Sequence, residues 1–390
     1  MLILVFALLF LIIFTYFEFR KHKIYRRKIS LVVHVNGTRG KSSVTRLIAA
    51  GFRAGGKKTV AKTTGSAPRL ILEDGSELPI ERIFGPNIRE QIKIMKFAAD
   101  RNVETLVLEC MAITPEYQWV TEHKMVESDI GVITNIRPDH LDVMGPGIKN
   151  VAYSICNTIP HAAKLYTSEK KCFQVIEKIA QNNQTNAKLV EKSEVTDEEI
   201  KKFPFFAHKE NVSLALKICS DYGIDREIAL KGMYEMKPDI GATNVYSIYR
   251  SGKKINFIHA FAANDPKSTR RVINNVKQVY EEIEQVFLLL NTREDRLFRS
   301  KQLIRMLSDE KFEKLFLIGR ETDRISSYAK RNNIPRNKII NFGWTDEKKL
   351  LTILGEEEME EIWLFGIGNI GGNGKLIVEY FKEESKKRSK

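Results

Sequence analysis

The residues with the clearest chemistry form a short glycine loop, Gly37-Thr38-Arg39-Gly40-Lys41-Ser42-Ser43, between a β-branched run and a stretch that can continue as a helix. This order places free backbone N–H groups and a lysine at a helix N-terminus, where they surround a polyphosphate while the serine hydroxyl reaches Mg²⁺. The loop is two residues shorter than the common G-x-x-x-x-G-K-[ST] pattern. We therefore predict a phosphate-binding loop over residues 37–43.

Ionisable residues follow two later apolar runs. One run ends in Glu109, and another leads into Asp139-His140-Leu141-Asp142. Ligands of parallel sheets collect where the carboxyl ends of the strands open into a crevice, so both groups are expected beside the glycine loop. We predict that Glu109 binds Mg²⁺. His140 is predicted to offer its imidazole to a second Mg²⁺ or to a reacting carboxylate, with Asp139 or Asp142 orienting it.

The elements that must position these residues follow from the hydrophobic pattern. Apolar runs alternate with amphipathic segments, which is typical of a parallel sheet covered by helices in an α/β fold. Strands are predicted over residues 31–35, 59–62, 105–109 and 130–135, and in a second group over 255–260, 286–290, 315–318 and 362–365. Residues 181–201 are polar and are interpreted as a solvated surface of helix and loop.

The grouping of these runs predicts two domains. A helix predicted over Asn211–Tyr222 is followed by Gly223 and then by Pro and Gly at residues 238–241, which punctuate the pattern. We therefore expect an ATP-binding domain over 31–240 and a smaller domain over 241–390. A length of 390 residues with 43% apolar and 29% charged side chains suits two globular domains.

The N-terminus predicts a membrane anchor. Residues 1–17 contain no charged side chain, and cations gather only afterwards, between Arg20 and Lys28. A cleaved signal peptide would carry its charge before the apolar run, so a transmembrane helix over 1–19 and a basic juxtamembrane segment over 20–30 are expected. The positive-inside rule then predicts a single-pass protein of the plasma membrane, with its N-terminus outside and its body in the cytoplasm. The alternative is a buried or interfacial helix.

Charge and cysteine content exclude other classes. The net charge of +14 suits an anionic substrate or a membrane surface, but no basic stripe is interleaved with aromatic residues, so no nucleic acid partner is expected. The four cysteines lack CxxC spacing and predict neither a zinc site nor disulfides. Cys110 is expected to be a small buried side chain rather than a reactive one.

The motifs resemble the Mur ligase superfamily, and within it the CapB/PgsB-type ligase subunit of poly-γ-glutamate synthase. The segments that carry the resemblance are Asn36–Ser42, Lys62–Gly65, Gly85–Ile88, Glu109–Ala112, Asp139–Pro146, Phe261–Thr269, Asn291–Arg296 and Gly366–Ile370. They span nearly the whole chain. The resemblance implies a P-loop, Mur-ligase-like central ATPase domain with a mostly parallel sheet and a Rossmann-like α/β C-terminal domain behind the transmembrane helix.

The resemblance also implies residue roles. It assigns Lys41 to the ATP phosphates, Ser42 and Glu109 to Mg²⁺, His140 to a second Mg²⁺, and Asn211 to the adenine side. It places Arg293 and Asp295 with the nucleotide, and Thr64, Asn87, Arg89, Asn264, Lys267 and Arg296 with the substrate. The chain departs from the family where Glu210 and Leu214 replace residues of the adenine helix motif, and where Ile155 aligns near a lysine that is often carbamylated.

The implied activity is an ATP-dependent amide ligase that polymerises glutamate into poly-γ-glutamate through an acyl phosphate. It would work as the catalytic subunit of a membrane synthase with small integral membrane subunits, and it is a possible homo-oligomer. The alternatives are a folylpolyglutamate-synthetase-like or peptidoglycan Mur-like ligase, and a membrane-tethered P-loop ATPase that drives a partner. A long UDP-sugar-binding domain would precede the loop in the peptidoglycan enzymes, but only thirty-six residues precede Gly37.

Overall fold

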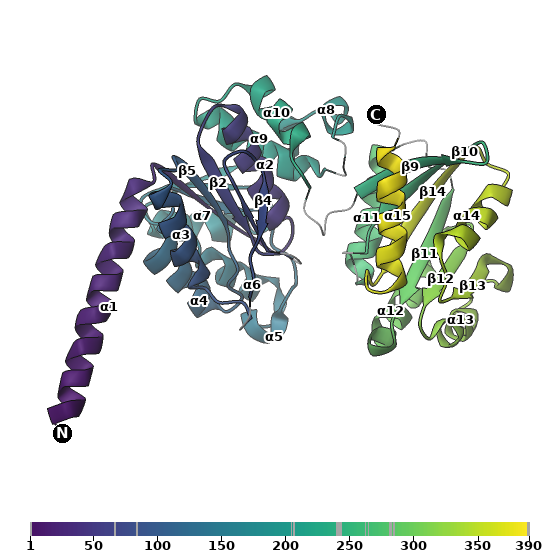
Figure 1. Ribbon diagram of the computed structural model, residues 1–390, viewed down its shortest axis with the longest axis horizontal. Helices are drawn as coiled ribbons and strands as arrows, with labels where there is room; N and C mark the ends of the chain where they lie inside the picture. The colour runs from purple at the N-terminus through teal and green to yellow at the C-terminus, as the bar shows by residue number, and fades with distance from the viewer. Residues whose placement is uncertain are drawn as a thin grey trace. The chain divides into compact units, whose positions relative to one another are not determined.

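A computed structural model describes residues 2–65, 68–82, 85–203, 205, 207–238, 244–261, 263, 265–280, 283 and 285–387. The chain forms two compact units. Unit 1 comprises Met1–Phe203 and Ala207–Ile240, and unit 2 comprises Pro204–Phe206 and Gly241–Lys390. Each unit is an α/β domain built on its own sheet (Figure 1), which confirms the predicted fold class.

The chain begins with a long helix, α1 (Leu2–Lys28). Among the described residues, α1 is the one helix long and apolar enough to cross a membrane. The helix does not end with the apolar stretch. It continues without a break through the basic residues 20–28, so the expected juxtamembrane segment is helical, and only Ile29 and Ser30 separate it from the first strand.

The sheet of unit 1 has eight strands in the order β4-β3-β2-β5-β1-β6-β7-β8. Neighbours are parallel except at β2–β3 and β3–β4, so the sheet is mostly parallel, as predicted. The strands are β1 (Leu31–Asn36), β2 (Thr59–Thr63), β3 (Arg69–Ile71), β4 (Glu77–Pro79), β5 (Thr105–Glu109), β6 (Ile130–Ile133), β7 (Lys164–Thr167) and β8 (Asn186–Leu189). Strand β8 corrects the interpretation of residues 181–201 as helix and loop alone.

Helices cover both faces of this sheet. One face packs against α3 (Glu90–Asp100), α4 (Pro115–Val120), the π-helix η1 (Thr121–Val126), α6 (Gly147–Cys156) and α7 (Phe173–Asn182). The other face holds α2 (Lys41–Ala54), which packs against α9 (Lys209–Asp221) and α10 (Arg226–Glu235). Figure 1 shows the two layers on opposite sides of the strands. The short elements are α5 (Leu141–Met144), η2 (Lys192–Glu194) and α8 (Asp197–Lys201).

Unit 2 is a three-layer domain with six strands in the order β13-β12-β11-β14-β10-β9, in which only β9 is antiparallel to its neighbour. The strands are β9 (Asn244–Arg250), β10 (Lys253–His259), β11 (Val286–Thr292), β12 (Leu315–Gly319), β13 (Ile339–Gly343) and β14 (Glu361–Gly368). One core packs α11 (Pro266–Val279), α12 (Leu297–Leu307) and α13 (Thr322–Arg331) against the sheet. The other core holds α14 (Glu347–Glu356) and α15 (Asn373–Lys386). The 3-10 turns are η3 (Glu294–Arg296) and η4 (Arg336–Lys338).

Candidate active site

The glycine loop lies at the carboxyl end of β1 and leads directly into α2. Gly37 and Gly40 have φ values of 134° and 82°, which side chains rarely tolerate. A Cβ on Gly37 would meet the Thr134 hydroxyl at 2.1 Å, and a Cβ on Gly40 would lie 3.0 Å from the Asn211 amide. Both glycines are therefore required by conformation and by space, and the second contact places Asn211 against the loop.

The end of β6 holds the loop in shape. Asn135 Oδ1 accepts hydrogen bonds from the Thr38 hydroxyl at 2.8 Å and from the Arg39 N–H at 3.2 Å, and Asn135 Nδ2 donates to the Arg39 carbonyl at 2.8 Å. The Asn135 carbonyl accepts from the Thr38 N–H at 2.9 Å. Since every one of these bonds ends on a loop residue, Asn135 is a positioning residue that our list of predicted site residues omits.

Two predicted metal ligands meet at the start of α2. The Ser42 hydroxyl donates to Glu109 Oε2 at 2.9 Å, and the same oxygen accepts the Thr64 N–H at 2.7 Å. Glu109 is buried, with 3% of its surface exposed. A carboxylate and a hydroxyl are hard oxygen ligands of the kind that Mg²⁺ prefers, so these residues suit the predicted ion. The Lys41 ammonium lies on the loop and donates to the Gly37 carbonyl at 2.7 Å.

His140 lies at the start of α5, exposed, with a φ of 44°. Across the described parts of the chain, no three His, Cys, Asp or Glu side chains converge as a metal site. An ion pair of 3.8 Å between Arg39 and Asp139 links the His140 turn to the glycine loop. The role of His140 at a second metal stays a prediction.

A buried lysine stands beside Glu109. Lys62 has no exposed surface, and its Nζ lies 3.1 Å from Glu90 Oε2 and 3.1 Å from Gln91 Oε1. Gln91 Nε2 in turn donates to the Glu109 carbonyl at 3.0 Å. Burial lowers the pKa of Lys62. Lys62 is not among the site residues predicted from the sequence. The signal that could have identified it is a lysine inside the predicted buried strand, residues 59–63.

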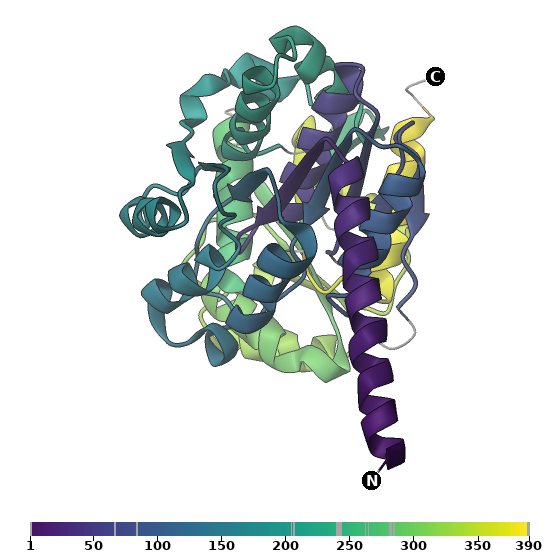
Figure 2. The same ribbon diagram turned by 90° about the vertical axis from the view of Figure 1, so that its left-hand side faces the viewer.

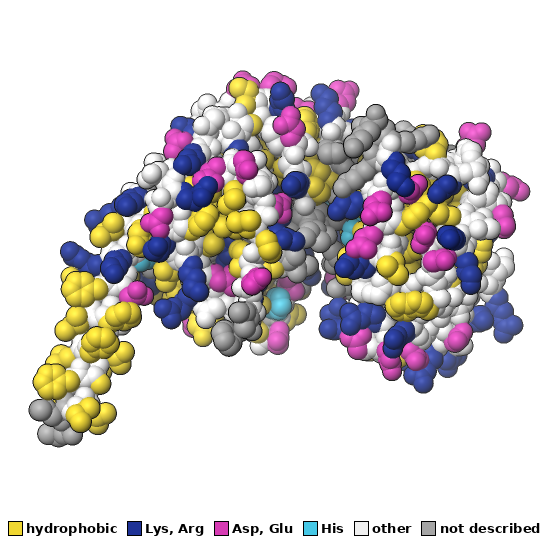
Figure 3. Space-filling model, viewed as in Figure 1, with side chains coloured by type: hydrophobic (Ala, Val, Ile, Leu, Met, Phe, Trp, Pro, Cys, Tyr) yellow, Lys and Arg dark blue, Asp and Glu magenta, His cyan; other side chains and the backbone are white. Residues whose placement is uncertain are grey.

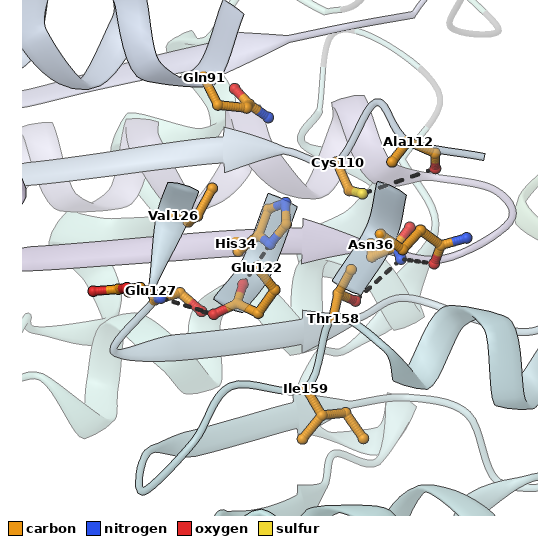
Figure 4. Close-up of polar contacts among 12 residues, drawn as sticks. His34, Asn36, Gln91, Cys110, Ala112, Glu122, Val126, Glu127, Thr158 and Ile159 are labelled. Atoms are coloured by element: carbon orange, nitrogen blue, oxygen red, sulfur yellow. Dashed lines mark hydrogen bonds and ion pairs between the residues drawn. The ribbon is translucent and has the colours of Figure 1, made fainter. Parts of the chain in front are cut away.

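A layer of buried polar side chains lies behind the loop, on the face of β1 that packs against α4 and η1 (Figure 4). His34 Nδ1 lies 2.6 Å from Glu122 Oε2, and Glu122 Oε1 accepts the Ser128 N–H at 2.8 Å. Asn36 Nδ2 donates to Gln118 Oε1 at 3.0 Å and to the Thr158 hydroxyl at 3.1 Å. Alternate residues of β1 therefore fasten the strand that carries the loop to the helices beside it.

The contacts of His34 and Glu122 shift both pKa values toward the charged forms. Burial lowers the pKa of His34, but the Cys110 thiol and the Glu122 carboxylate outweigh it and raise that pKa to about 10. Burial raises the pKa of Glu122, but the His34 imidazolium and Ser128 outweigh it and hold that pKa below its usual value. Cys110 is buried, as predicted, but it lies against an imidazolium rather than among apolar groups alone.

Of the other predicted substrate residues of unit 1, Asn87 and Arg89 have no hydrogen bond to Ser42 or Glu109 among those found in the described residues, whereas Thr64 contacts Glu109 through its backbone. Asn87 and Arg89 are exposed just before α3, where Asn87 Oδ1 accepts the Arg89 N–H at 2.9 Å. Thr64 contributes its backbone N–H to Glu109. The substrate roles of these three residues stay predictions.

The predicted residues of unit 2 gather at the carboxyl edge of its own sheet. Arg293 makes a two-point contact with Asp295, at 3.0 and 2.9 Å, and Arg296 lies 3.6 Å from the same carboxylate. A Cβ on Gly371 would lie 3.1 Å from the Arg293 guanidinium, so this arginine borders the glycine-rich turn after β14. Lys267 is exposed at the start of α11. Asn264 lies outside the described residues.

Two domain families match the chain. Residues 35–237 match the Mur ligase middle domain, and residues 245–384 match the poly-gamma-glutamate synthase CapB C-terminal domain. Two curated proteins are similar over almost all of the chain. It is 36% identical over 388 residues to the capsule biosynthesis protein CapB of Bacillus anthracis, covering 98% of this chain and 83% of that protein. It is 32% identical over 384 residues to the PGA synthase CapB of Bacillus subtilis (strain 168), covering 98% of both.

Solved structures share the fold at low identity. The chain resembles folylpolyglutamate synthase of Thermotoga maritima with a TM-score of 0.66 and 16% identity, covering 98% of this chain and 99% of that one. It resembles E. coli FolC in complex with ADP with a TM-score of 0.66 and 14% identity, covering 95% and 93%. These likenesses show a common α/β architecture.

Proposed function

This chain belongs to the CapB family of Mur ligase-like proteins, and from that premise we propose that it is the ligase of a membrane synthase, joining glutamate units into poly-γ-glutamate with ATP. The observation that carries the proposal is the meeting of the glycine loop, Ser42 and Glu109 at one edge of a parallel sheet. Such an edge is where α/β folds bind nucleotide phosphates.

The reaction needs an activated carboxylate, because a free carboxylate is a poor electrophile. We propose that the glutamyl carboxylate oxygen attacks the γ-phosphorus of ATP, so that a carboxylate–phosphoryl bond forms as the bond to ADP breaks. The amine of the next glutamate then attacks the acyl carbon, the amide bond forms as the nitrogen gives up one proton, and inorganic phosphate leaves with the electron pair of the broken C–O bond and takes up that proton. One amide bond is made for each ATP converted to ADP.

The residues of the loop suit the first step. The backbone N–H groups at the start of α2 and the Lys41 ammonium would hold the β- and γ-phosphates and offset the charge that develops during transfer. Mg²⁺ held by Ser42 and Glu109 would supply further positive charge at the phosphoryl oxygens. Asn135 keeps the loop in the conformation that presents these donors.

The proposed membrane location and orientation of the chain rest on α1. We propose that α1 spans the plasma membrane once, with the N-terminus outside and both units in the cytoplasm, because the cations lie on its C-terminal side. A polyanion made in the cytoplasm cannot cross lipid unaided, so small integral membrane subunits are expected as partners.

The decisive experiment supplies the chain, reconstituted in membranes with its partner subunits, with ATP, Mg²⁺ and each amino acid in turn while ADP and product length are followed. Glutamate should be the preferred amino acid, and hydroxylamine should trap the acyl phosphate as a glutamyl hydroxamate. Lys41→Ala should abolish both products, because backbone donors alone leave the phosphate charge poorly offset. ADP release that ignores every amino acid, without hydroxamate, would instead favour a membrane-tethered ATPase that drives a partner.

A further inference from the structure

The anchor helix is bonded directly to unit 1. His22 Nε2 donates to the Met125 carbonyl at 2.6 Å, and the Arg26 guanidinium donates to the Val126 carbonyl at 3.0 Å and to the Glu127 carbonyl at 2.8 Å. Arg26 also forms an ion pair of 2.8 Å with Asp129. These carbonyls lie at the C-terminal end of η1, so α1 is hydrogen-bonded to η1 at two points along its length.

This attachment fixes how close the helices of unit 1 lie to the bilayer. The stretch of α1 that is predicted to span the membrane ends at Phe19, three residues before His22. At a rise of 1.5 Å per residue, the contact with η1 lies about 5 Å along the helix from the end of that stretch. If α1 spans the membrane, as proposed above, η1 and α3, which contact α1, lie close to the lipid headgroups. Helices α4 and α6 belong to the same layer of unit 1 as α3 (Figures 1 and 2).

The same layer carries four of the nine exposed large apolar side chains that the described part of unit 1 has outside α1. Tyr117 and Trp119 on α4 are 57% and 43% exposed, and Ile148 and Tyr153 on α6 are 39% and 49% exposed. A hydrogen bond of 3.0 Å from Gln118 to Ser154 holds these two helices side by side. Among the described residues of α2, α9 and α10 on the opposite face, Ile228 alone is exposed in this way.

Cations accompany these aromatic residues. The Lys124 ammonium lies 5.3 Å from the centre of the Trp119 ring, and Lys149 is exposed on α6 beside Ile148. Lysine and arginine side chains also surround the base of α1, where it meets unit 1 (Figure 3). Tryptophan and tyrosine favour the interface between water and lipid, and basic side chains favour anionic headgroups.

We propose that Tyr117, Trp119, Lys124, Ile148, Lys149 and Tyr153 form a lipid-facing surface that rests on the headgroup layer of an anionic bilayer. The proposal rests on the membrane span of α1. The surface holds unit 1 in one orientation on the membrane, since α1 fixes one point of contact and α4 with α6 provides a second.

Tryptophan quenching by brominated lipids tests this surface. The full chain carrying Trp344→Phe is reconstituted in anionic vesicles with and without brominated acyl chains, which leaves Trp119 and the buried Trp363 as emitters. Brominated lipid should reduce the emission, and Trp119→Phe in the same background should remove that reduction. Lys124→Glu with Lys149→Glu should weaken the quenching, whereas Lys231→Glu on the opposite face is a matched control that should leave it unchanged.

Flotation of the same vesicles separates the two proposals. A chain that does not float with the lipid shows that α1 is no anchor, which removes the premise. A chain that floats but whose Trp119 emission ignores the brominated lipid overturns the lipid-facing surface, including the case in which a protein covers α4 and α6 instead.

Discussion

At the scale of single residues, the site depends on side chains whose hydrogen bonds position the glycine loop and the predicted metal ligands. Glu109 Oε2 accepts one bond from the Ser42 hydroxyl and one from the Thr64 backbone, so three segments distant in sequence meet at one oxygen atom. Glu109 and Ser42 follow from strand ends and loop pattern, and they could be predicted. Asn135 acts through hydrogen bonds to the loop after the neighbouring strand, and Lys62 through a hydrogen bond to Gln91 on α3. Neither partner is visible in the order of residues.

Glu109→Gln should raise the Mg²⁺ concentration needed for half-maximal activity by at least about tenfold, because an amide oxygen is a weaker ligand for a hard cation than a carboxylate. The measurement is ATP-dependent ligation over a Mg²⁺ titration. Glu104 directly precedes β5, at the opposite end of the strand from Glu109. Glu104→Gln is therefore the matched control, and its activity should depend on Mg²⁺ concentration as that of the wild type does. An unchanged titration for Glu109→Gln would make Glu109 a structural residue only.

Asn135→Asp should weaken ATP binding without unfolding unit 1. The change replaces the donor to the Arg39 carbonyl with an acceptor, so two oxygens face each other at 2.8 Å and the loop must shift. We expect a rise of about tenfold in KM for ATP, which corresponds to roughly 1.4 kcal/mol. Equal KM values, measured beside an unchanged thermal midpoint, would mean that the loop keeps its shape without this residue.

At the scale of elements, local chemistry sets most boundaries. The buried strands of both sheets could be predicted from continuous apolar runs, and all eight predicted strands are present in the structure. Six strands, β3, β4, β7, β8, β9 and β13, were not predicted. Strand β8, for example, has no apolar run, because its four positions alternate between exposed and half-buried at the edge of the sheet. Helix α11 begins at Pro266 because Asp265 accepts the Ser268 N–H at 3.0 Å and caps the helix there.

The contact between Glu122 on η1 and His34 on β1 predicts that a conservative substitution of Glu122 strongly lowers the stability of unit 1. Glu122→Gln should destabilise unit 1 by about 3–5 kcal/mol, because it leaves the buried His34 imidazolium without its counter-ion. Chemical unfolding followed by circular dichroism measures this loss. The double variant His34→Gln with Glu122→Gln should recover part of the stability, since it leaves no buried charge. A double variant as unstable as the single one would contradict the ion-pair account.

The same pair predicts a pH dependence of stability. The pKa of His34 in the fold lies above its unfolded value near 6.5, so its contribution is fully present below about pH 6.5 and is lost as pH rises toward 10. The pKa of Glu122 is lowered, so its contribution is present above about pH 4.5 and is lost on acidification. The loss of unfolding free energy between pH 6.5 and 9 should therefore be steeper in the wild type than in the double variant.

At the scale of the whole molecule, the chain is one long N-terminal helix followed by two α/β units, each built on its own sheet. Deleting residues 2–19 should leave a protein that stays in solution and binds ATP, because every bond between α1 and η1 lies downstream. Deleting residues 2–27 should instead lower the unfolding midpoint, since it removes His22 and Arg26 from η1. Thermal unfolding of both forms with and without ATP gives the comparison, and equal midpoints would show that α1 adds nothing to unit 1.

Because α1 is one unbroken helix, the direction in which its N-terminal side chains face is fixed relative to unit 1. Each residue turns an α-helix by about 100°, so one alanine inserted after Phe19 would rotate the side chains of residues 2–19 by that angle relative to unit 1. Seven inserted residues complete nearly two full turns and restore the direction. A subunit that binds one face of α1 within a bilayer would therefore have a fixed orientation about the helix axis relative to the ATP site. Polymer synthesis should then fall when one residue is inserted and recover when seven are inserted.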